Sequence, residues 1–237
     1  MIEKALRYIN SFRDIQVIPH NNLSFTNDKL YQLPEDAPAV FGTKTLASLV
    51  ELILKEHSHN SLNDLIIHVD SPTRVNIHTV LRDHLDRFNL YSAVAELPKI
   101  TFDNYLDLEA MNIMLKSAFV QNETRDTLIQ VLSRVVEDAI KTSADDGMAQ
   151  EVTVKTGIRT LAKMEMPTIV KLAPYRTFIE VEQPEGEFLL RLRKGPDAAL
   201  FEADGGAWKL QARKNIKQYF ETNLADLILQ GKVIVTE

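Results

Sequence analysis

The 237-residue sequence contains no cysteine, which excludes a disulfide, a thiolate nucleophile and any metal site built on cysteine. It also lacks a long apolar run. Its most apolar stretch, LASLVELIL at residues 46–54, contains Glu51 and is far too short to span a bilayer. The first residues carry Glu3, Lys4 and Arg7, so they do not form the apolar core of a signal peptide. We therefore expect no membrane partner and a location in the cytoplasm.

The composition is that of an ordinary globular protein, with 45% hydrophobic and 25% charged residues. The net charge of −6 argues against broad electrostatic attraction to nucleic acid or anionic lipid. Residues 1–150 carry 14 basic and 21 acidic side chains, whereas residues 151–237 carry 13 and 12. Any anion-binding surface is therefore expected in the second part of the chain.

Apolar residues at helical spacing predict three shorter helices and one long one in the first part. The shorter helices are expected at residues 2–12, at 107–120 and from a cap at Thr43 or Thr45 to about His57. The long helix is expected to begin at Asn122 and to end around Ser143. One of its faces carries Leu128, Val131, Leu132, Val135, Val136, Ala139 and Ile140.

Alternating apolar and polar residues predict the strands. In the first part they are expected at residues 14–18, 65–70 and 74–80, with a loop at 21–38; residues 81–97 fit a strand or a short helix. In the second part they are expected at residues 151–156, 168–173, 176–182, 187–193 and 198–203. A helix at 207–229, a cap at Gly231 and a strand at 232–236 follow.

These elements predict an α+β fold. We expect a single domain over residues 1–237, whose N-terminal part is rich in helices and contains a hairpin and one long helix. The rest is expected to be a mostly antiparallel sheet closed by a long C-terminal helix. A possible sub-division separates residues 1–144 from residues 145–237.

A predicted hairpin around Gln183-Pro184-Glu185-Gly186 suggests an interface. Pairing Glu182 with Glu187 places Val181 opposite Phe188 and Ile179 opposite Leu190 on one apolar face. Glu182 and Glu187 would repel each other unless the basic group of a partner lay between them. The other face then presents the candidate interface residues Arg176, Glu180, Glu182, Glu187, Arg191 and Arg193.

A second candidate site is the start of the last helix, at Gly205 and Gly206. Backbone amides at a helix N-terminus lack intrahelical partners and attract anions. The candidate residues for binding a nucleic acid or another anion are Gly205, Gly206, Lys209, Arg213, Lys214 and Lys217. The alternative, which we favour, is that Asp204 caps the helix, the glycines make a turn and the basic residues form a solvated face.

Other chemistry has weaker support. Asp145 and Asp146, with Glu151 and Lys155, suggest a metal-dependent hydrolase, but Asp-Asp-Gly after a helix usually forms a turn. A zinc site lacks a carboxylate at metal spacing near the two histidines of the strands at 65–70 and 74–80. The run FGTKT at residues 41–45 lacks the upstream glycine of a phosphate-binding loop. We expect no catalytic residue, no metal and no cofactor.

Three runs resemble the uncharacterised YfdQ-like proteins of tailed phages and prophages. They are DDGMAQEVTVKTGI (145–158), APYRTFIEVEQPEGEFLLRLRKG (173–195) and ALFEADGGAWKLQARKNIKQYF (199–220). The resemblance covers most of residues 60–230. It implies a phage or prophage protein that acts in the bacterial cytoplasm, and no catalytic residue can be carried over from the family.

Together these patterns favour a non-enzymatic, self-associating phage protein, whose expected partners are further copies of itself. The first alternative is a nucleic-acid-binding accessory of phage replication or recombination, with DNA or RNA as the partner. The second is a metal-dependent hydrolase. A host protein also stays open as a partner.

Overall fold

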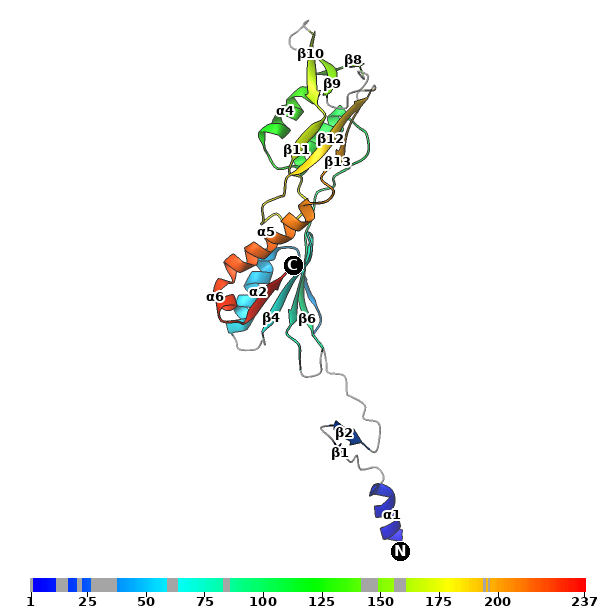
Figure 1. Ribbon diagram of the computed structural model, residues 1–237, viewed down its shortest axis with the longest axis vertical. Coiled ribbons are helices and arrows are strands. Elements are labelled where there is room, and N and C mark those ends of the chain that lie inside the picture. The colour runs from blue at the N-terminus through cyan, green and yellow to red at the C-terminus, as the bar shows by residue number, and fades with distance from the viewer. Residues whose placement is uncertain are drawn as a thin grey trace. The chain divides into compact units, whose positions relative to one another are not determined.

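The chain divides into two compact units, residues 1–37 and 38–237, which are described separately. The computed structural model describes residues 2–11, 17–20, 23–26, 38–58, 64–82, 86–141, 149–155, 161–193, 195 and 197–237 (Figure 1). No boundary at residue 37 is predicted from the sequence. The possible sub-division at residue 144 falls outside the described residues.

The described residues of the first unit form a helix and a hairpin. The predicted helix is confirmed as α1 (Ile2–Ser11). The predicted first strand is β1 (Val17–His20), which pairs antiparallel with β2 (Leu23–Thr26). The prediction of a loop throughout 21–38 is therefore wrong at β2, where a short Leu-Ser-Phe-Thr run has enough β-propensity to pair with its neighbour.

A five-stranded sheet forms one layer of the second unit, in the order β14-β4-β5-β6-β3. The hairpin predicted at 65–80 is confirmed, and the open stretch 81–97 contains a strand. The three central strands are antiparallel, while β14 and β3 run parallel to their neighbours. The strands are β3 (Phe41–Thr43), β4 (Leu65–Ser71), β5 (Arg74–Thr79), β6 (Asn89–Val94) and β14 (Val233–Thr236).

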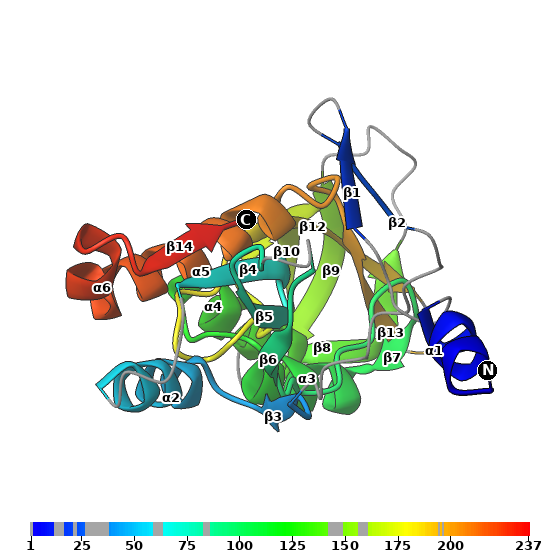
Figure 2. The same ribbon diagram turned by 90° about the horizontal axis from the view of Figure 1, so that it is seen from below.

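Helices cover one face of this sheet. Figures 1 and 2 show α2 (Leu46–Ser58) and α5 (Trp208–Asn223) on the same side of the strands, with the short α6 (Ala225–Leu229) next to α5. Leu65, Ile67 and Val69 of β4 and Val75 and Ile77 of β5 face the helices and are buried, which gives the period of two that the sequence predicts. They form one core with Leu49, Ile53, Ile216 and Phe220.

A second core lies beneath a four-stranded antiparallel sheet, in the order β11-β12-β13-β7. One face of this sheet packs on α3 (Leu108–Ala118) and α4 (Glu123–Leu132), and buries Phe119, Phe188 and Leu190 among others. Its strands are β7 (Leu106–Asp107), β11 (Ile169–Leu172), β12 (Gly186–Arg193) and β13 (Asp197–Glu202). A further antiparallel sheet consists of β8 (Val135–Lys141), β9 (Ala149–Lys155) and β10 (Leu161–Pro167).

The mixture of helices and strands is confirmed, but the long helix from Asn122 to Ser143 is wrong. Its start is correct, since the Asn122 side chain accepts a hydrogen bond from the Arg125 amide at 2.8 Å. The helix ends at Leu132, however, and β8 follows it. The apolar residues of the second half are β-branched at positions 135, 136 and 140, and pairing with β9 uses their strand preference.

The predicted strand at 176–182 is also wrong, and with it the predicted hairpin. Strand β12 pairs with β11 and β13, so that Phe188 lies opposite Val170 and Glu202. The long closing C-terminal helix is not confirmed either. The helix predicted there, α5, ends at Asn223 and is followed by α6 and β14. It contacts the five-stranded sheet through β4 and β14.

The cap of α4 gives a first prediction. Asn122→Ala should lower the free energy of unfolding by about 1 kcal/mol, because the Arg125 amide loses its acceptor at the helix N-terminus. Chemical denaturation measures the change. Thr127→Ala, at an exposed position within the same helix, is the control and should leave stability unchanged or slightly raised. An equal loss in both variants would contradict the role of the cap.

Candidate functional site

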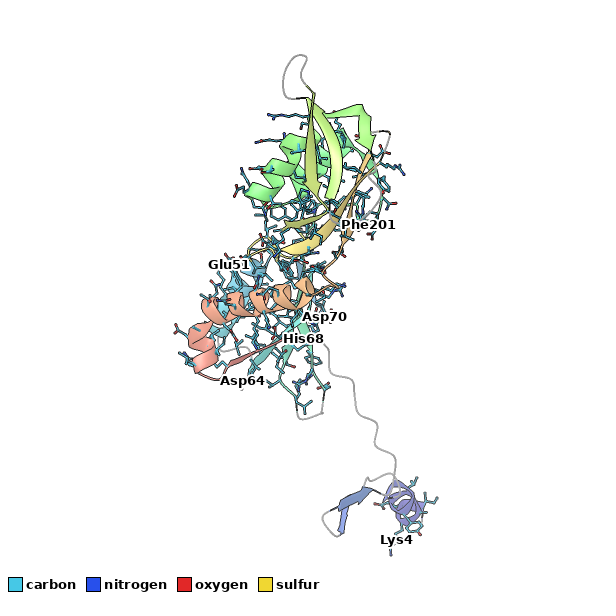
Figure 3. All side chains as sticks on the ribbon, turned by 45° about the horizontal axis from the view of Figure 1, so that its top comes forward. Lys4, Glu51, Asp64, His68, Asp70 and Phe201 are labelled. Atoms are coloured by element: carbon cyan, nitrogen blue, oxygen red, sulfur yellow. The ribbon has the colours of Figure 1, made fainter. Side chains whose placement is uncertain are left out.

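The exposed face of the four-stranded sheet carries an apolar row across three strands. Ile169 of β11, Leu189 of β12 and Phe201 of β13 lie opposite one another in register (Figure 3 labels Phe201). Ile169 is 54% exposed, and the other two are partly exposed. We call this surface the outer sheet face. It comprises Ile169, Lys171, Glu187, Leu189, Arg191, Arg193 and Phe201. Ala199 lies on the same side of β13 but is fully buried, and the Tyr105 ring packs edge-on against Phe201.

Charged residues flank the apolar row on both sides. On one side Lys171 lies 3.6 Å from Glu187, with both side chains at least half exposed. On the other side Arg193 donates two hydrogen bonds to Asp197, at 2.9 and 2.8 Å, and lies 4.1 Å from the Tyr105 ring. Arg191 has no ion pair or hydrogen bond with the residues that the structure describes. An apolar centre with a charged rim is the usual anatomy of a protein interface.

The structure separates the predicted interface residues into two groups. Glu187, Arg191 and Arg193 share the outer sheet face, as the period of two predicts. Arg176, Glu180 and Glu182 lie elsewhere, because residues 176–182 form a loop rather than a strand. The Gln183 side chain holds this loop, accepting from the Arg176 and Thr177 amides and donating to the carbonyl groups of Phe178 and Val181.

Arg176 is buried at the junction between the two cores. Its guanidinium donates to Glu202 at 2.6 Å and lies 3.4 Å from Asp204. It stacks over Trp208 at 4.1 Å and approaches Phe188 at 5.6 Å. Burial lowers the pKa of Arg176 from its ordinary value, while Asp204 and Glu202 oppose that shift. The junction thus joins the end of β13 and the start of α5 to the second core.

Gly186, the first residue of β12, leaves room for this arrangement. A Cβ atom there would lie 2.5 Å from Nη2 of Arg176 and 2.7 Å from Oδ2 of Asp204. To admit a Cβ atom, the ends of both side chains would have to move, which would disturb the contact between Arg176 and Asp204. The glycine thus permits the close approach of the guanidinium to the strand.

The mouth of α5 is occupied by the protein's own carboxylate. Asp204 accepts the Gly206 amide at 3.0 Å while it pairs with Arg176, and both glycines adopt positive φ angles of 61° and 80°. The helix begins at Trp208 rather than at Ala207, and no side chain caps it. The predicted cap at Asp204 is therefore wrong, because Asp204 binds the Gly206 amide in the turn before the helix. These contacts favour the structural interpretation of Gly205 and Gly206 over anion binding, which stays a prediction.

The basic residues of α5 do not form one exposed stripe. Lys209 and Lys214 are exposed, whereas Arg213 and Lys217 are half-buried beside the face that contains Ala212 and Ile216. Lys209, Arg213 and Lys217 are thus four residues apart, but they do not share one exposed face: Lys209 is exposed, and the other two lie closer to the packed side of the helix.

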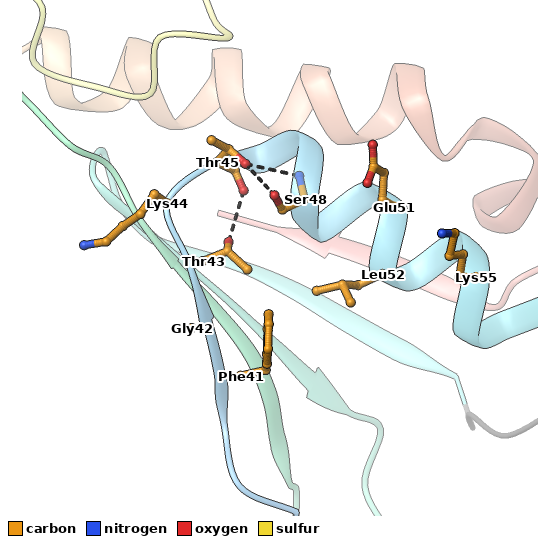
Figure 4. Close-up of a pocket in the computed structure, with 9 residues that line it drawn as sticks. All are labelled: Phe41, Gly42, Thr43, Lys44, Thr45, Ser48, Glu51, Leu52 and Lys55. Atoms are coloured by element: carbon orange, nitrogen blue, oxygen red, sulfur yellow. Dashed lines mark hydrogen bonds between the residues drawn. The ribbon is translucent and has the colours of Figure 1, made fainter.

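A cavity of about 440 Å³ lies between β3 and α2 (Figure 4). Thr45 accepts from the Ser48 amide at 3.3 Å, which confirms Thr45 as the cap of α2. The Leu46 amide, however, donates to the Glu180 carboxylate at 2.8 Å. A carboxylate of the protein thus lies at the helix N-terminus, in agreement with the rejection of a phosphate-binding loop at FGTKT. The cavity is lined by Phe41, Gly42, Thr43, Lys44, Thr45, Ser48, Glu51, Leu52 and Lys55.

A second cavity of about 380 Å³ adjoins one end of the outer sheet face. Lys171 and Glu187 belong to both surfaces, and Trp208 lines the cavity from the start of α5. Three acidic residues, Glu185, Glu187 and Asp204, line it against a single lysine. This end of the outer sheet face is therefore acidic.

The candidate metal ligands give no site among the described residues. Asp145 and Asp146 fall outside the described residues, and the side chain of Glu151 is not described. His68 and His78 lie on neighbouring strands of the five-stranded sheet, and burial, His68 and Arg87 lower the pKa of His78. The described part of the chain contains no group of three metal-binding side chains.

No known protein family, no curated protein and no solved structure matches this chain. Among the described residues, no helix has the length and apolar character needed to cross a bilayer.

The Arg176 junction gives a second prediction. Arg176→Met keeps most of the side-chain volume but leaves Asp204, whose side chain is 11% exposed, without its counter-charge. We expect a loss of about 3 kcal/mol in the free energy of unfolding. Lys44→Met is the control, because Lys44 pairs with Glu96 at 3.6 Å with both side chains more than half exposed, and it should cost at most about 1 kcal/mol. Similar losses in the two variants would show that the junction is not a special contact.

Proposed function

We propose that the protein is a non-enzymatic, self-associating protein of a tailed phage or prophage that acts in the bacterial cytoplasm. The observation that carries self-association is the apolar row on the outer sheet face. Ile169 is 54% exposed there and continues into Leu189 and Phe201. A sheet with one packed face tolerates polar residues on the other, so an apolar row on that side favours a covering partner.

The partner that best fits this surface is another copy of the chain. A partner with a single sign of charge would meet repulsion at one end or the other, since acidic and basic residues occupy opposite ends of the face. A second copy carries both signs in the same arrangement. The phage context comes from the resemblance of residues 145–220 to the YfdQ-like proteins, and the membership of this chain in that family is part of the proposal.

The apolar row supplies the first test of self-association. Ile169→Lys should shift the light-scattering mass of the purified protein toward the 26.9 kDa of one chain, because a charged side chain would have to enter the apolar centre. The matched control is Ile234→Lys, at a 49% exposed isoleucine on β14, an edge strand of the five-stranded sheet. A wild-type protein of monomer mass at all concentrations contradicts the proposal, as does an unchanged mass in Ile169→Lys.

Nucleic-acid binding is the second candidate function, favoured by the exposed Lys209 and Lys214 at the start of α5. It predicts an affinity for DNA or RNA that falls steeply with salt, because the contacts would be made to phosphates. Alanine at Lys209, Arg213, Lys214 and Lys217 together should then weaken binding at least about tenfold and flatten the salt dependence. The control is a second fourfold alanine variant, at Lys44, Lys55, Lys99 and Lys116. Equal binding by the two variants would rule this function out.

A further inference from the structure

The charges of the outer sheet face are ordered along β12. Going from the start of the strand, Glu187 comes first, Leu189 lies in the apolar row, and Arg191 and Arg193 follow. All four point to the same side, because successive outward residues are two positions apart. Glu185 extends the acidic end into the adjoining cavity. The strand therefore runs from an acidic end, across an apolar centre, to a basic end.

This order is its own complement under a two-fold rotation. If two copies pack with these faces together and β12 antiparallel to β12, an axis through Leu189 places each residue k positions before it opposite the residue k positions after it. Glu187 then faces Arg191 of the second copy, and Glu185 lies toward its Arg193. In both pairs the rotation therefore brings an acidic residue of one copy toward a basic residue of the other.

The apolar row lies in the direction that this rotation requires. Ile169, Leu189 and Phe201 are paired across neighbouring strands, so the row runs perpendicular to β12. A two-fold axis that makes the two β12 strands antiparallel and brings the two faces together runs between the sheets and parallel to them. It is also perpendicular to β12. The row therefore lies along the axis, and it stacks on the same row of the second copy.

We infer that two copies of this chain pair through the outer sheet face about a two-fold axis at Leu189, with Glu187 of each copy bound to Arg191 of the other. This inference rests on the proposed self-association and names its interface. Two observations make the pair available. Arg191 has no partner among the described residues, and Glu187 has only an exposed contact with Lys171 at 3.6 Å.

Because each sheet is twisted, the charge pair nearer the axis is the closer of the two. Sheets that pack face to face are about 10 Å apart and cross at about −30°. Two residues from the axis, such a crossing displaces facing positions by about 3 Å, and four residues from it by about 7 Å. The pair of Glu187 with Arg191 therefore stays within reach of long side chains, and that of Glu185 with Arg193 is looser. Arg193 is in addition held by Asp197.

Charge reversal tests this pairing in the full-length protein. Arg191→Glu gives two acidic pairs in the dimer and Glu187→Arg gives two basic pairs, so each variant should raise the dissociation constant at least about tenfold. Mixing the two variants restores both opposite-charge pairs and should restore association. The double variant on one chain should associate like the wild type. Sedimentation velocity at several concentrations measures each constant.

Controls separate folding from association. Each variant is compared with the wild type by circular dichroism and thermal unfolding, and Lys99→Glu, at an exposed loop position, controls for the change in net charge. Glu185→Arg should weaken association less than Glu187→Arg, because its partner position is farther from the axis.

The outcomes distinguish the inference from the proposal beneath it. A monomeric wild-type protein overturns both. A wild-type protein that associates, with folded single variants that associate equally well, leaves self-association in place and overturns this interface. Weakened single variants whose mixture stays dissociated overturn the two-fold pairing. Restoration by the mixture and by the double variant supports it.

Discussion

The buried guanidinium of Arg176 is the contact on which the second unit depends. It joins segments that are distant in sequence, because its two carboxylate partners, Glu202 and Asp204, end β13 and precede α5, while Trp208 covers its face. A charge in this position is costly unless it is paired, so the fold keeps both partners and a glycine at position 186 to admit them. The same arrangement places the Asp204 carboxylate in the turn before α5, where it accepts the Gly206 amide and favours a structural role for the two glycines.

Much of the local structure follows from the sequence alone. The caps at Thr45 and Asn122, the hairpin of β4 and β5 and the start of β12 were all predictable from spacing and residue type. The second half of the predicted helix after Asn122 was not, because Val135, Val136 and Ile140 fit one helical face and a β-strand equally well. What decides between them is the pairing of β8 with β9, which is separated from it along the chain. Period alone carries no information about such a partner.

The candidate site shows the same limit. The outward positions of β12 could be predicted, since alternation fixes which residues share a face, and Glu187, Arg191 and Arg193 do. The strand that pairs with β12 could not be predicted. Residues 176–182 alternate as a strand would, but the Gln183 side chain holds them in a loop. The choice of β11 in their place brings Ile169 beside Leu189. The apolar row, the feature that most favours an interface, therefore became visible only in three dimensions.

The junction and the outer sheet face are mechanically connected. Strand β12 begins at Gly186, against the guanidinium of Arg176, and its next residue, Glu187, is the acidic member of the proposed pair. Asp204 is fixed by that same guanidinium and lines the acidic cavity. The acidic end of the face is therefore rigid through a buried ion pair, and the basic end is ordered by Arg193 with Asp197 and Tyr105. The backbone of the strand is thus held at both ends of the face, whereas the Glu187 and Arg191 side chains have no strong partner among the described residues of one copy. They can therefore turn toward a second copy, and exposed charge pairs of this kind set the orientation of association more than its strength.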